Sequence, residues 1–203
     1  MITLYGNRRS RATRCLWALE ELQLTYNHIA IDHLAGETKA PDYLRLNPSG
    51  KVPTLVDGKL VMFESVAINL YLAQTYGRAP MWPADQSQRA HTLQWSFWAV
   101  AEAEPPIVTL AMERVFKPEP ARDPDLASAA GRDLTGRLAL IAAGLADGTP
   151  HLIDPAFTIA DLNIASILGS VRMVGFDLSP WPALNAWLER CLSRPAYQKA
   201  MGR

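Results

Sequence analysis

The beginning of the chain alternates short apolar runs with an amphipathic stretch, an order typical of an α/β domain. Ile2 to Tyr5 is an apolar, β-branched run closed by Gly6, which predicts a buried strand. The segment after Ser10 carries apolar residues at three- and four-residue spacing, which predicts an amphipathic helix with Ser10 as its N-cap. Residues 26–31 are β-prone and follow without a hairpin turn. We therefore expect a second strand, parallel to the first and joined to it through the helix.

A hairpin and a second helix are predicted further along. Apolar runs at 52–56 and 60–63 flank Asp57-Gly58, a strong signal for a two-residue hairpin turn. A helix with apolar residues on one face follows Glu64-Ser65 and ends near Gly77. The four predicted strands make a mixed sheet.

From Asp85 onward the pattern is helical throughout, with no convincing period-two strand. The predicted helices cover 85–115, 123–146, 158–174 and 181–201. Pro105-Pro106 should kink or split the first of them, because proline removes a backbone donor and clashes with the preceding turn. We therefore expect an α/β domain at 1–77, a linker at 78–84 and an all-helical domain at 85–203.

Charge and cysteine content narrow the function classes. The 20 Lys and Arg residues balance the 20 Asp and Glu residues, which speaks against a nucleic-acid-binding protein. No secretory signal and no apolar stretch of membrane-spanning length is evident, so we expect a cytoplasmic protein that does not enter membranes. The two cysteines, Cys15 and Cys191, and the four scattered histidines predict neither a disulfide framework nor a metal site. Cys15 lies on the apolar helix face and is expected to be a small buried hydrophobe.

Three local motifs make the order of elements more specific. Residues 47–55 read Asn-Pro-Ser-Gly-Lys-Val-Pro-Thr-Leu, Glu64-Ser65 is followed by Ala67-Ile68 and Tyr71-Leu72, and residues 157–161 read Phe-Thr-Ile-Ala-Asp. With the order of elements, these motifs resemble the cytosolic glutathione S-transferase family across nearly the whole chain. The resemblance implies a thioredoxin-like N-terminal domain, an all-helical C-terminal domain, glutathione as substrate or cofactor, and a homodimer.

The same resemblance assigns residues to the glutathione tripeptide. In the family the Val-Pro bond of the first motif is cis, and at Val52-Pro53 such a bond would present the Val52 backbone to the extended cysteinyl part of glutathione. Ser65 would cap a helix whose N–H groups receive the γ-glutamyl carboxylate, while Glu64 meets the ammonium. Lys39 and Lys51 are the candidate cations for the glycyl carboxylate, and either also reads as solvated surface.

The chemistry requires a group that stabilises the glutathione thiolate, because only the thiolate attacks an electrophile well. Ser10 is the first candidate, since it stands at the predicted helix start and resembles the serine or cysteine found there in several bacterial classes. Asn7 is its rival, Tyr5 reads more readily as a packing residue, and Ser10 reads equally well as a plain N-cap. Three neighbouring arginines would make the mouth of the site electropositive: Arg8, Arg9 and Arg11.

Two sets of residues are predicted in the helical domain. The electrophile pocket is expected along its first helix, where residues that also read as core gather: Trp95, Trp98, Glu102, Pro105 and Met112. Thr158 and Asp161 have the spacing of a capping box, which we assign to folding stability and not to catalysis.

Three functions remain compatible with these motifs. The first is a glutathione transferase that directs the thiolate to a small apolar electrophile. The second is an enzyme that keeps glutathione as a cofactor, such as an isomerase or a dehalogenase. The third is a non-catalytic, transferase-like binding or regulatory protein. Because the Val-Pro and Glu-Ser motifs are intact, the transferase is favoured, and the sequence leaves its electrophile open.

Overall fold

The computed structural model describes residues 1–145, 148–153 and 156–203, and it divides into two compact units. The first unit comprises Met1–Trp82 with Ser193–Arg203, and the second comprises Pro83–Leu192. The boundary near residue 82 falls inside the predicted linker. The last segment of the chain belongs to the first unit, whereas the helical pattern of the sequence predicted it in the helical domain.

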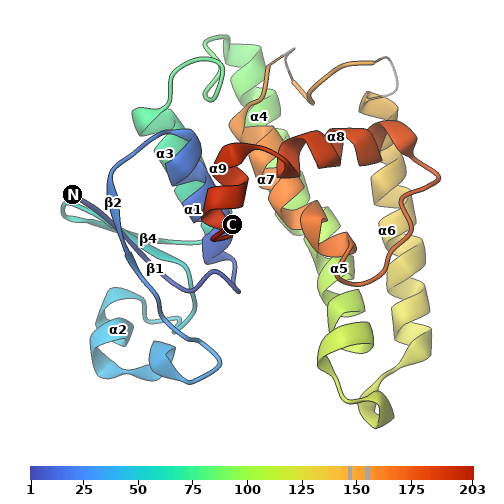
Figure 1. The fold of residues 1–203 in the computed structure, drawn as a ribbon, viewed down its shortest axis with the longest axis horizontal. Helices are drawn as coiled ribbons and strands as arrows, with labels where there is room; N and C mark the ends of the chain where they lie inside the picture. Colours follow the sequence, from blue (N-terminus) through green and yellow to red (C-terminus); the bar gives the residue numbers. More distant parts are fainter. Residues whose placement is uncertain (146–147, 154–155) are drawn as a thin grey trace. The chain divides into compact units, whose positions relative to one another are not determined.

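The first unit is built on a four-stranded mixed sheet in the order β2-β1-β3-β4 (Figure 1). The strands are β1 (Ile2–Tyr5), β2 (Tyr26–Ile29), β3 (Thr54–Asp57) and β4 (Leu60–Phe63). β1 pairs parallel with β2 and antiparallel with β3, and β3 pairs antiparallel with β4. The mixed sheet and its parallel pair are as predicted. The hairpin turn consists of Gly58 and Lys59, one position later than predicted.

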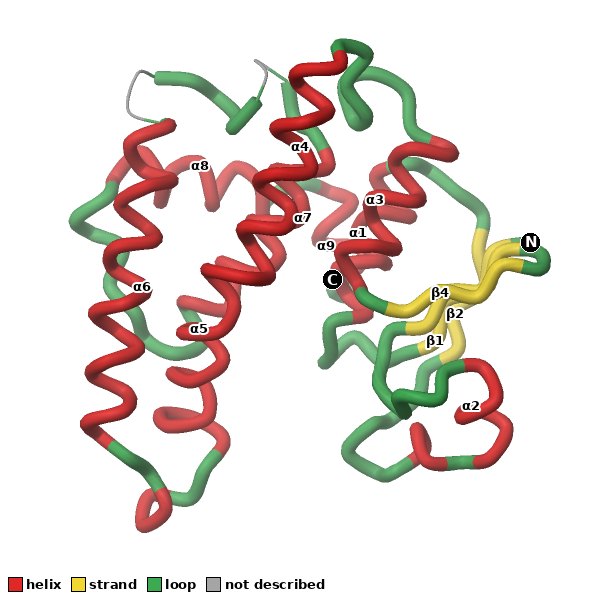
Figure 2. Tube along the Cα trace, turned by 180° about the vertical axis from the view of Figure 1, so that it is seen from behind, coloured by secondary structure: helices red, strands yellow, loops and turns green. Residues whose placement is uncertain are grey.

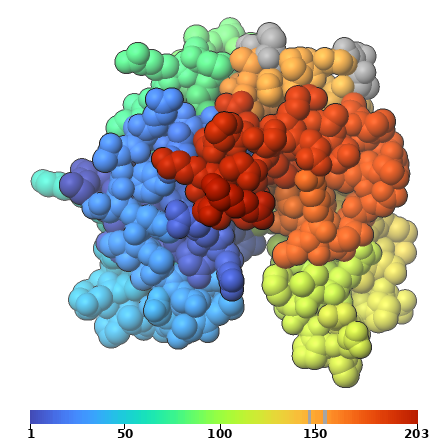
Figure 3. Space-filling view, in the orientation of Figure 1, coloured from blue at the N-terminus to red at the C-terminus, as the bar shows by residue number. Residues whose placement is uncertain are grey.

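Helices cover this sheet on both sides. α1 (Ala12–Glu21) and α3 (Ser65–Tyr76) pack against each other on one face, and α2 (Pro41–Leu46), preceded by a 3₁₀ turn at Glu37–Lys39, lies on the other side (Figure 2). The core of this unit is apolar and closed to solvent; its fully buried side chains include Leu4, Leu16, Trp17, Leu55 and Ile68. α9 (Pro195–Ala200) packs on the outer side of α1, so the red C-terminal end meets the blue start of the chain in the space-filling view (Figure 3).

The single helix predicted over 181–201 is wrong, because the chain breaks between α8 (Pro182–Leu192) and α9. Pro195 is the first residue of α9, and Arg194 before it has the extended conformation that a following proline imposes, with φ −59° and ψ 137°. The break lets the final turn of helix leave the second unit and pack on α1.

The second unit consists of helices. α4 (Gln86–Trp98), a π-helical turn (Ala99–Ala103), α5 (Glu104–Ala111) and a second π-helical turn (Met112–Phe116) replace the predicted helix 85–115. They are followed by α6 (Pro124–Gly144), α7 (Ile159–Leu168) and α8, with short 3₁₀ turns at Glu119–Ala121 and Gly169–Val171. α6 runs beside α5, and α7 packs against both α4 and α8 (Figure 2). α7 is therefore the buried centre of this unit.

The proline pair produces the expected interruption of the first long helix. Pro105 and Pro106 have no backbone N–H, so the carbonyls one turn earlier lose their α-helical donors. The backbone forms a π-helical turn at Ala99–Ala103. α5 then starts with the prolines in its first turn, where a backbone N–H donor is not needed.

The predicted capping box is confirmed at the start of α7. The Thr158 hydroxyl accepts from the Ala160 N–H at 3.3 Å, and the Asp161 carboxylate accepts from the Thr158 N–H at 3.0 Å. The end predicted for the preceding long helix, residue 146, lies outside the described residues; α6 ends at Gly144. Within the described ranges, none of the helices has the length and apolar character that crossing a membrane requires.

Candidate functional site

The sheet register gathers the predicted glutathione-binding segments at one edge. Tyr5 is paired with Thr54, and Thr54 is paired with Phe63. The carboxyl ends of β1 and β4 and the amino end of β3 therefore lie side by side. The residues just beyond them, 6–11, 51–53 and 64–65, must meet at this edge, which we call the site edge.

Gly6 brings two of these segments into direct contact. Its φ of +133° lies in a region that L side chains rarely adopt, and a Cβ at this position would come within 2.7 Å of the Ala12 Cβ and 3.1 Å of the Val52 Cβ. Only glycine lets the end of β1 pass between α1 and the loop before β3. The turn 7–10 is thereby held beside Val52.

The loop before β3 presents its backbone at the site edge. The Val52-Pro53 bond is cis, as the resemblance implied. Val52 is half-buried, and in the described part of the chain its backbone N–H and C=O make no hydrogen bond. A peptide lying along this edge could therefore pair with Val52 as an added strand does.

Two buried side chains hold this loop in place. The Tyr43 hydroxyl donates to the Lys51 carbonyl at 2.7 Å, and the Asn47 amide donates to the same carbonyl at 2.9 Å and to the Thr54 hydroxyl at 3.1 Å. Burial raises the pKa of the Tyr43 hydroxyl, so it remains a protonated donor. The backbone before Val52 is thus fixed before any ligand arrives.

Glu64 and Ser65 connect β4 to α3 in a strained geometry. Glu64 is exposed and has φ +72° and ψ 107°, a rare conformation for a residue with a side chain. Such strain is concentrated at ligand sites, where the surrounding structure enforces it. The prediction that Ser65 caps the helix is wrong: Ser65 is the first residue of α3, and Glu64 occupies the cap position without a side-chain cap bond. The first N–H groups of α3 are therefore open to an external acceptor.

Ser65 is instead bound to α1 through its side chain and carbonyl. The Arg14 guanidinium, 8% exposed, donates to the Ser65 hydroxyl at 3.3 Å, and the Cys15 thiol lies 3.5 Å from the Ser65 carbonyl. Burial raises the pKa of Cys15, which is fully buried, so its thiol stays protonated and unreactive at neutral pH. The buried cation and the N-terminus of α3 together make this end of the site edge attractive to an anion.

The end of β1 and the turn after it carry the three candidate sulfur donors: Tyr5 is the last residue of the strand, and Asn7 and Ser10 lie in the turn. The Ser10 hydroxyl donates to the Asn7 carbonyl at 2.7 Å and accepts from the Ala12 N–H at 3.1 Å, so its only proton is engaged within the turn. α1 begins at Ala12 and Arg11 occupies its N-cap position, so the prediction that Ser10 is the N-cap is wrong. The Asn7 side-chain oxygen accepts from the Arg9 N–H at 3.0 Å, whereas among the residues described its amide nitrogen makes only a long hydrogen bond, 3.5 Å, to the Asp32 carboxylate. Tyr5 stacks edge-to-face on Tyr43, with ring centres 6.2 Å apart, as a packing residue does.

The candidate cations differ in how closely they approach the site edge. A Cβ on Gly50 would lie 2.8 Å from the Lys39 ammonium nitrogen, so this ammonium sits over the backbone two residues before Val52. Lys51 is exposed, and its carbonyl, not its side chain, takes part in holding the loop. Both side chains are available to a carboxylate.

The residues predicted for the electrophile pocket share one face of the α4–α5 rod. The intervals between them are three, four, three and seven residues, which are whole helical turns: Trp95, Trp98, Glu102, Pro105 and Met112. Trp95 and Trp98 pack edge-to-face with ring centres 5.4 Å apart, and Met112 is 40% exposed. Glu102 is bound to α6 by an ion pair with Arg137 at 3.0 Å. Val108, also 40% exposed, extends the apolar part of this face and was not predicted.

Two family models match most of the chain. The model for the glutathione S-transferase N-terminal domain matches residues 1–74, and the model for the C-terminal domain matches residues 103–195. The chain belongs to the glutathione S-transferase family.

Individual members of the family are similar over their full length. Glutathione S-transferase GstB of Escherichia coli is 32% identical over 99% of this chain and 98% of its own. Disulfide-bond oxidoreductase YfcG, also of E. coli, is 31% identical over 99% of this chain and 94% of its own. The crystal structure of a theta class glutathione S-transferase from Xanthomonas axonopodis pv. citri with glutathione bound superposes with a TM-score of 0.91 at 33% identity, covering 100% of this chain and 97% of that one.

Several residues that build the site of this transferase escaped sequence reasoning. Gly6 and Arg14 have no recognisable chemistry in the sequence, because each acts through a tertiary contact. Asn47 was read only as part of the first motif, without a role of its own. The signal for Asn47 was present, since an Asn-Pro pair before a strand often marks a turn held by the Asn side chain. Gly6 was noted only as the end of a strand. Three His, Cys, Asp or Glu side chains that could share a metal ion do not come together among the residues described.

Proposed function

We propose that this transferase binds glutathione along the site edge and presents its thiolate to an electrophile. The cysteinyl part pairs with the Val52 backbone, the γ-glutamyl carboxylate meets the first N–H groups of α3 at Ser65, and the ammonium meets the Glu64 carboxylate. The observation that carries the proposal is the contact made through Gly6. It places the donors of the turn 7–10 beside the backbone that would hold the cysteinyl residue.

We further propose that Asn7, ahead of Ser10, stabilises the sulfur, which reverses the order favoured by the sequence. The Ser10 proton is already donated to the Asn7 carbonyl, and redirecting it would leave that carbonyl without its partner. The Asn7 amide has two hydrogens and, within the described ranges, one long hydrogen bond, to Asp32. An amide hydrogen bond to the thiolate favours the charged form and lowers the thiol pKa.

The two donors can be separated by a matched pair of variants. Asn7→Ala should raise the pKa of the bound glutathione thiol by about one unit, because it removes the donor to the thiolate. Ser10→Ala should leave that pKa close to the wild-type value and lower stability by about 1 kcal/mol through loss of the cap-like bond. Thiolate absorbance against pH and denaturant unfolding measure the two effects. A larger pKa change in Ser10→Ala would restore Ser10 as the donor.

Lys39 is the cation that we propose for the glycyl carboxylate, because its ammonium lies over Gly50. Lys39→Gln should weaken glutathione binding about fivefold, the effect of losing a partly exposed ion pair. Lys51→Gln should have a smaller effect, and Lys59→Gln, in the hairpin turn, should have none. Calorimetric titration with glutathione measures all three. Equal affinities of the Lys39→Gln and Lys59→Gln proteins would refute the assignment.

The electrophile is proposed to be small and apolar, because the exposed face of α4, α5 and their π-helical turns is largely apolar. Pro105, Val108 and Met112 lie on this face with the tryptophan pair Trp95 and Trp98. In the reaction the thiol proton leaves to solvent as glutathione binds. The thiolate sulfur then forms a bond to the electrophilic carbon. With an aryl halide, the halide departs with the bonding electrons. With an isothiocyanate, which has no leaving group, the electrons of the C=N bond move to nitrogen, and this nitrogen takes up a proton from solvent. Conjugation of glutathione to activated aryl halides and isothiocyanates tests this reaction.

Thiol–disulfide exchange is a second candidate reaction, favoured by the similarity to the relative named as a disulfide-bond oxidoreductase. Cys15 and Cys191 are both fully buried, so such a reaction would use the sulfur of glutathione and not a protein thiol. The reduction of a small disulfide by glutathione, measured beside the conjugation panel, separates the two reactions. Recovery of unconsumed glutathione after turnover would instead identify it as a cofactor.

The proposed quaternary structure is a homodimer in the cytoplasm, where glutathione is kept reduced. β4 is an edge strand with apolar side chains in solvent, among them Val61 (41% exposed) and Phe63 (48% exposed). Edges of this kind are normally covered. Sedimentation at micromolar concentration should give twice the mass of one chain, and Phe63→Glu should lower that mass. A monomer in the wild-type protein would contradict the dimer.

A further inference from the structure

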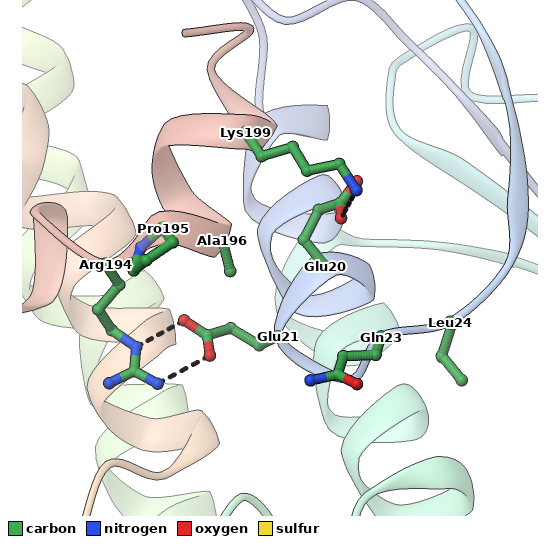
Figure 4. Close-up of a pocket in the computed structure, with 8 residues that line it drawn as sticks. All are labelled: Glu20, Glu21, Gln23, Leu24, Arg194, Pro195, Ala196 and Lys199. Atoms are coloured by element: carbon green, nitrogen blue, oxygen red, sulfur yellow. Dashed lines mark hydrogen bonds and ion pairs between the residues drawn. The ribbon is translucent and has the colours of Figure 1, made fainter.

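Within the first unit, the C-terminal helix α9 and the residue before it are bound to α1 by charged and aromatic contacts. Arg194 makes two hydrogen bonds to the Glu21 carboxylate, at 2.6 and 2.8 Å, and the Lys199 ammonium lies 2.7 Å from the Glu20 carboxylate (Figure 4). The ring of Trp17 packs edge-to-face on the ring of Tyr197, with centres 4.8 Å apart. Glu20, Glu21 and Trp17 all belong to α1, so α9 is fixed to the helix that follows the turn of residues 7–10. This turn carries the proposed donor to the thiolate, and we call it the sulfur-donor turn.

One hydrogen bond connects the far end of α9 to the sulfur-donor turn itself. The Arg8 side chain donates through Nε to the Ala200 carbonyl at 3.1 Å. Ala200 is the last residue of α9, so its carbonyl has no acceptor role within the helix, and a cation at this end is favoured by the helix dipole. The chain then turns at Gly202, φ +78°, and passes beside Arg8: a Cβ on Gly202 would lie 3.4 Å from the Arg8 Cδ.

Arg8 is also fixed at its backbone. The Thr13 hydroxyl, from the first turn of α1, donates to the Arg8 carbonyl at 2.6 Å. Arg8 directly follows Asn7, whose amide we propose as the sulfur donor, and a displacement of Arg8 must displace Asn7. Arg8 and its neighbour Arg9 are both exposed, but among the described residues the Arg9 side chain makes no hydrogen bond or ion pair, so the two arginines differ in attachment although they share a charge.

We infer that Arg8 is a positioning residue for the thiolate, and that α9 acts on the sulfur-donor turn through the Arg8–Ala200 hydrogen bond. This inference rests on the proposed function. Small misplacements of a reacting group cost large factors in rate, so a bond made one residue from the donor is well placed to control thiol activation. The contacts assigned to the rest of the tripeptide, at Val52, Glu64 and Ser65, do not involve Arg8.

Arg8→Gln and Arg9→Gln form the matched pair that tests this inference. Each removes one positive charge from the same turn, but only the first removes the bond to α9. Arg8→Gln should raise the pKa of the bound thiol by about one unit and lower kcat about tenfold below that pKa, with the KM for glutathione nearly unchanged. Arg9→Gln should show a smaller change, which measures the loss of charge alone.

Two shortened chains test the other partner of the bond. A chain ending after Ala200 keeps the acceptor oxygens as a carboxylate and should resemble the full chain. A chain ending after Lys199 lacks them and should resemble Arg8→Gln, and adding Arg8→Gln to it should cause no further change. Unfolding curves of each protein confirm that it is folded. If the shorter chain does not fold, the comparison of Arg8→Gln with Arg9→Gln still tests the inference.

The outcomes separate this inference from the proposed function. If the wild-type protein neither binds glutathione nor lowers its thiol pKa, the proposed function fails and the inference fails with it. If the wild type lowers that pKa, and Arg8→Gln and Arg9→Gln raise it equally, the arginines act only through their charge and the inference alone is overturned. An effect of Arg8→Gln confined to KM would overturn it as well.

Discussion

Replacing Gly6 by alanine is expected to destabilise the first unit and to weaken glutathione binding together. The new Cβ would sit 2.7 Å from the Ala12 Cβ, a distance that real Cβ atoms do not reach, and would push against Val52 at 3.1 Å. The φ of +133° adds backbone strain. Overpacking and strain together should cost about 3 kcal/mol of the free energy of unfolding. Displacement of Val52 should lower the affinity for glutathione about tenfold or more.

Gly58→Ala is the matched control for this experiment. Gly58 also has a positive φ, +60°, but a Cβ there would meet nothing within 4 Å. The control therefore carries backbone strain without a clash, and should cost about 1 kcal/mol and leave glutathione affinity unchanged. Denaturant unfolding and calorimetric titration measure both quantities. If Gly6→Ala matched Gly58→Ala in stability and affinity, the contact between the turn and Val52 would not define the site.

Removal of the Asp161 carboxylate should produce the largest loss of stability in the second unit. Asp161 is fully buried and accepts from the Thr158 N–H and hydroxyl, from the Leu152 N–H at 3.0 Å, and from the Trp187 indole at 3.0 Å. Asp161→Ala leaves these buried donors without an acceptor. Because each unsatisfied donor is costly, we expect a loss of about 4 kcal/mol.

Asp123→Ala provides the comparison for that variant. Asp123 caps α6 by accepting from the N–H groups of Asp125 and Leu126, both at 3.0 Å, in an exposed position where water can replace it. Its loss should cost about 1 kcal/mol. Thermal or denaturant unfolding measures both variants, and glutathione affinity of the folded proteins should stay at the wild-type value. A loss of affinity in folded Asp161→Ala would mean that the capping box does more than stabilise the fold.

The sequence contained most of the first unit because its signals are local. The apolar run before Gly6, the Asp57-Gly58 turn signal and the helix after Glu64 each depend on neighbours in the chain. The Val-Pro and Glu-Ser motifs indicated the glutathione site for the same reason, because each consists of residues adjacent in the chain. That the two motifs lie at the same edge of the sheet could be inferred from the family resemblance. The strand register that brings them together depends on pairing between distant segments, so neither motif alone reveals it.

The features that sequence reasoning missed depend on distant contacts or on competing local rules. The break before Pro195 was concealed by a continuous helical pattern on both sides of it. Ser65 was read as a cap because serine is frequent there, yet the strained Glu64 occupies that position. The engagement of Ser10 by the Asn7 carbonyl, and the bond from Arg8 to Ala200 across most of the chain, have no signature in residue spacing.

The most direct test of the account is the ionisation of glutathione on the purified wild-type protein. Glutathione is titrated with pH at saturating protein, and the thiolate is followed by its ultraviolet absorbance. A free cysteine thiol has a pKa of about 8.5, and the site edge should lower the pKa of the bound thiol by roughly two units. A bound thiol with an unchanged pKa, or no binding of glutathione at all, would contradict the claim that this edge activates the tripeptide.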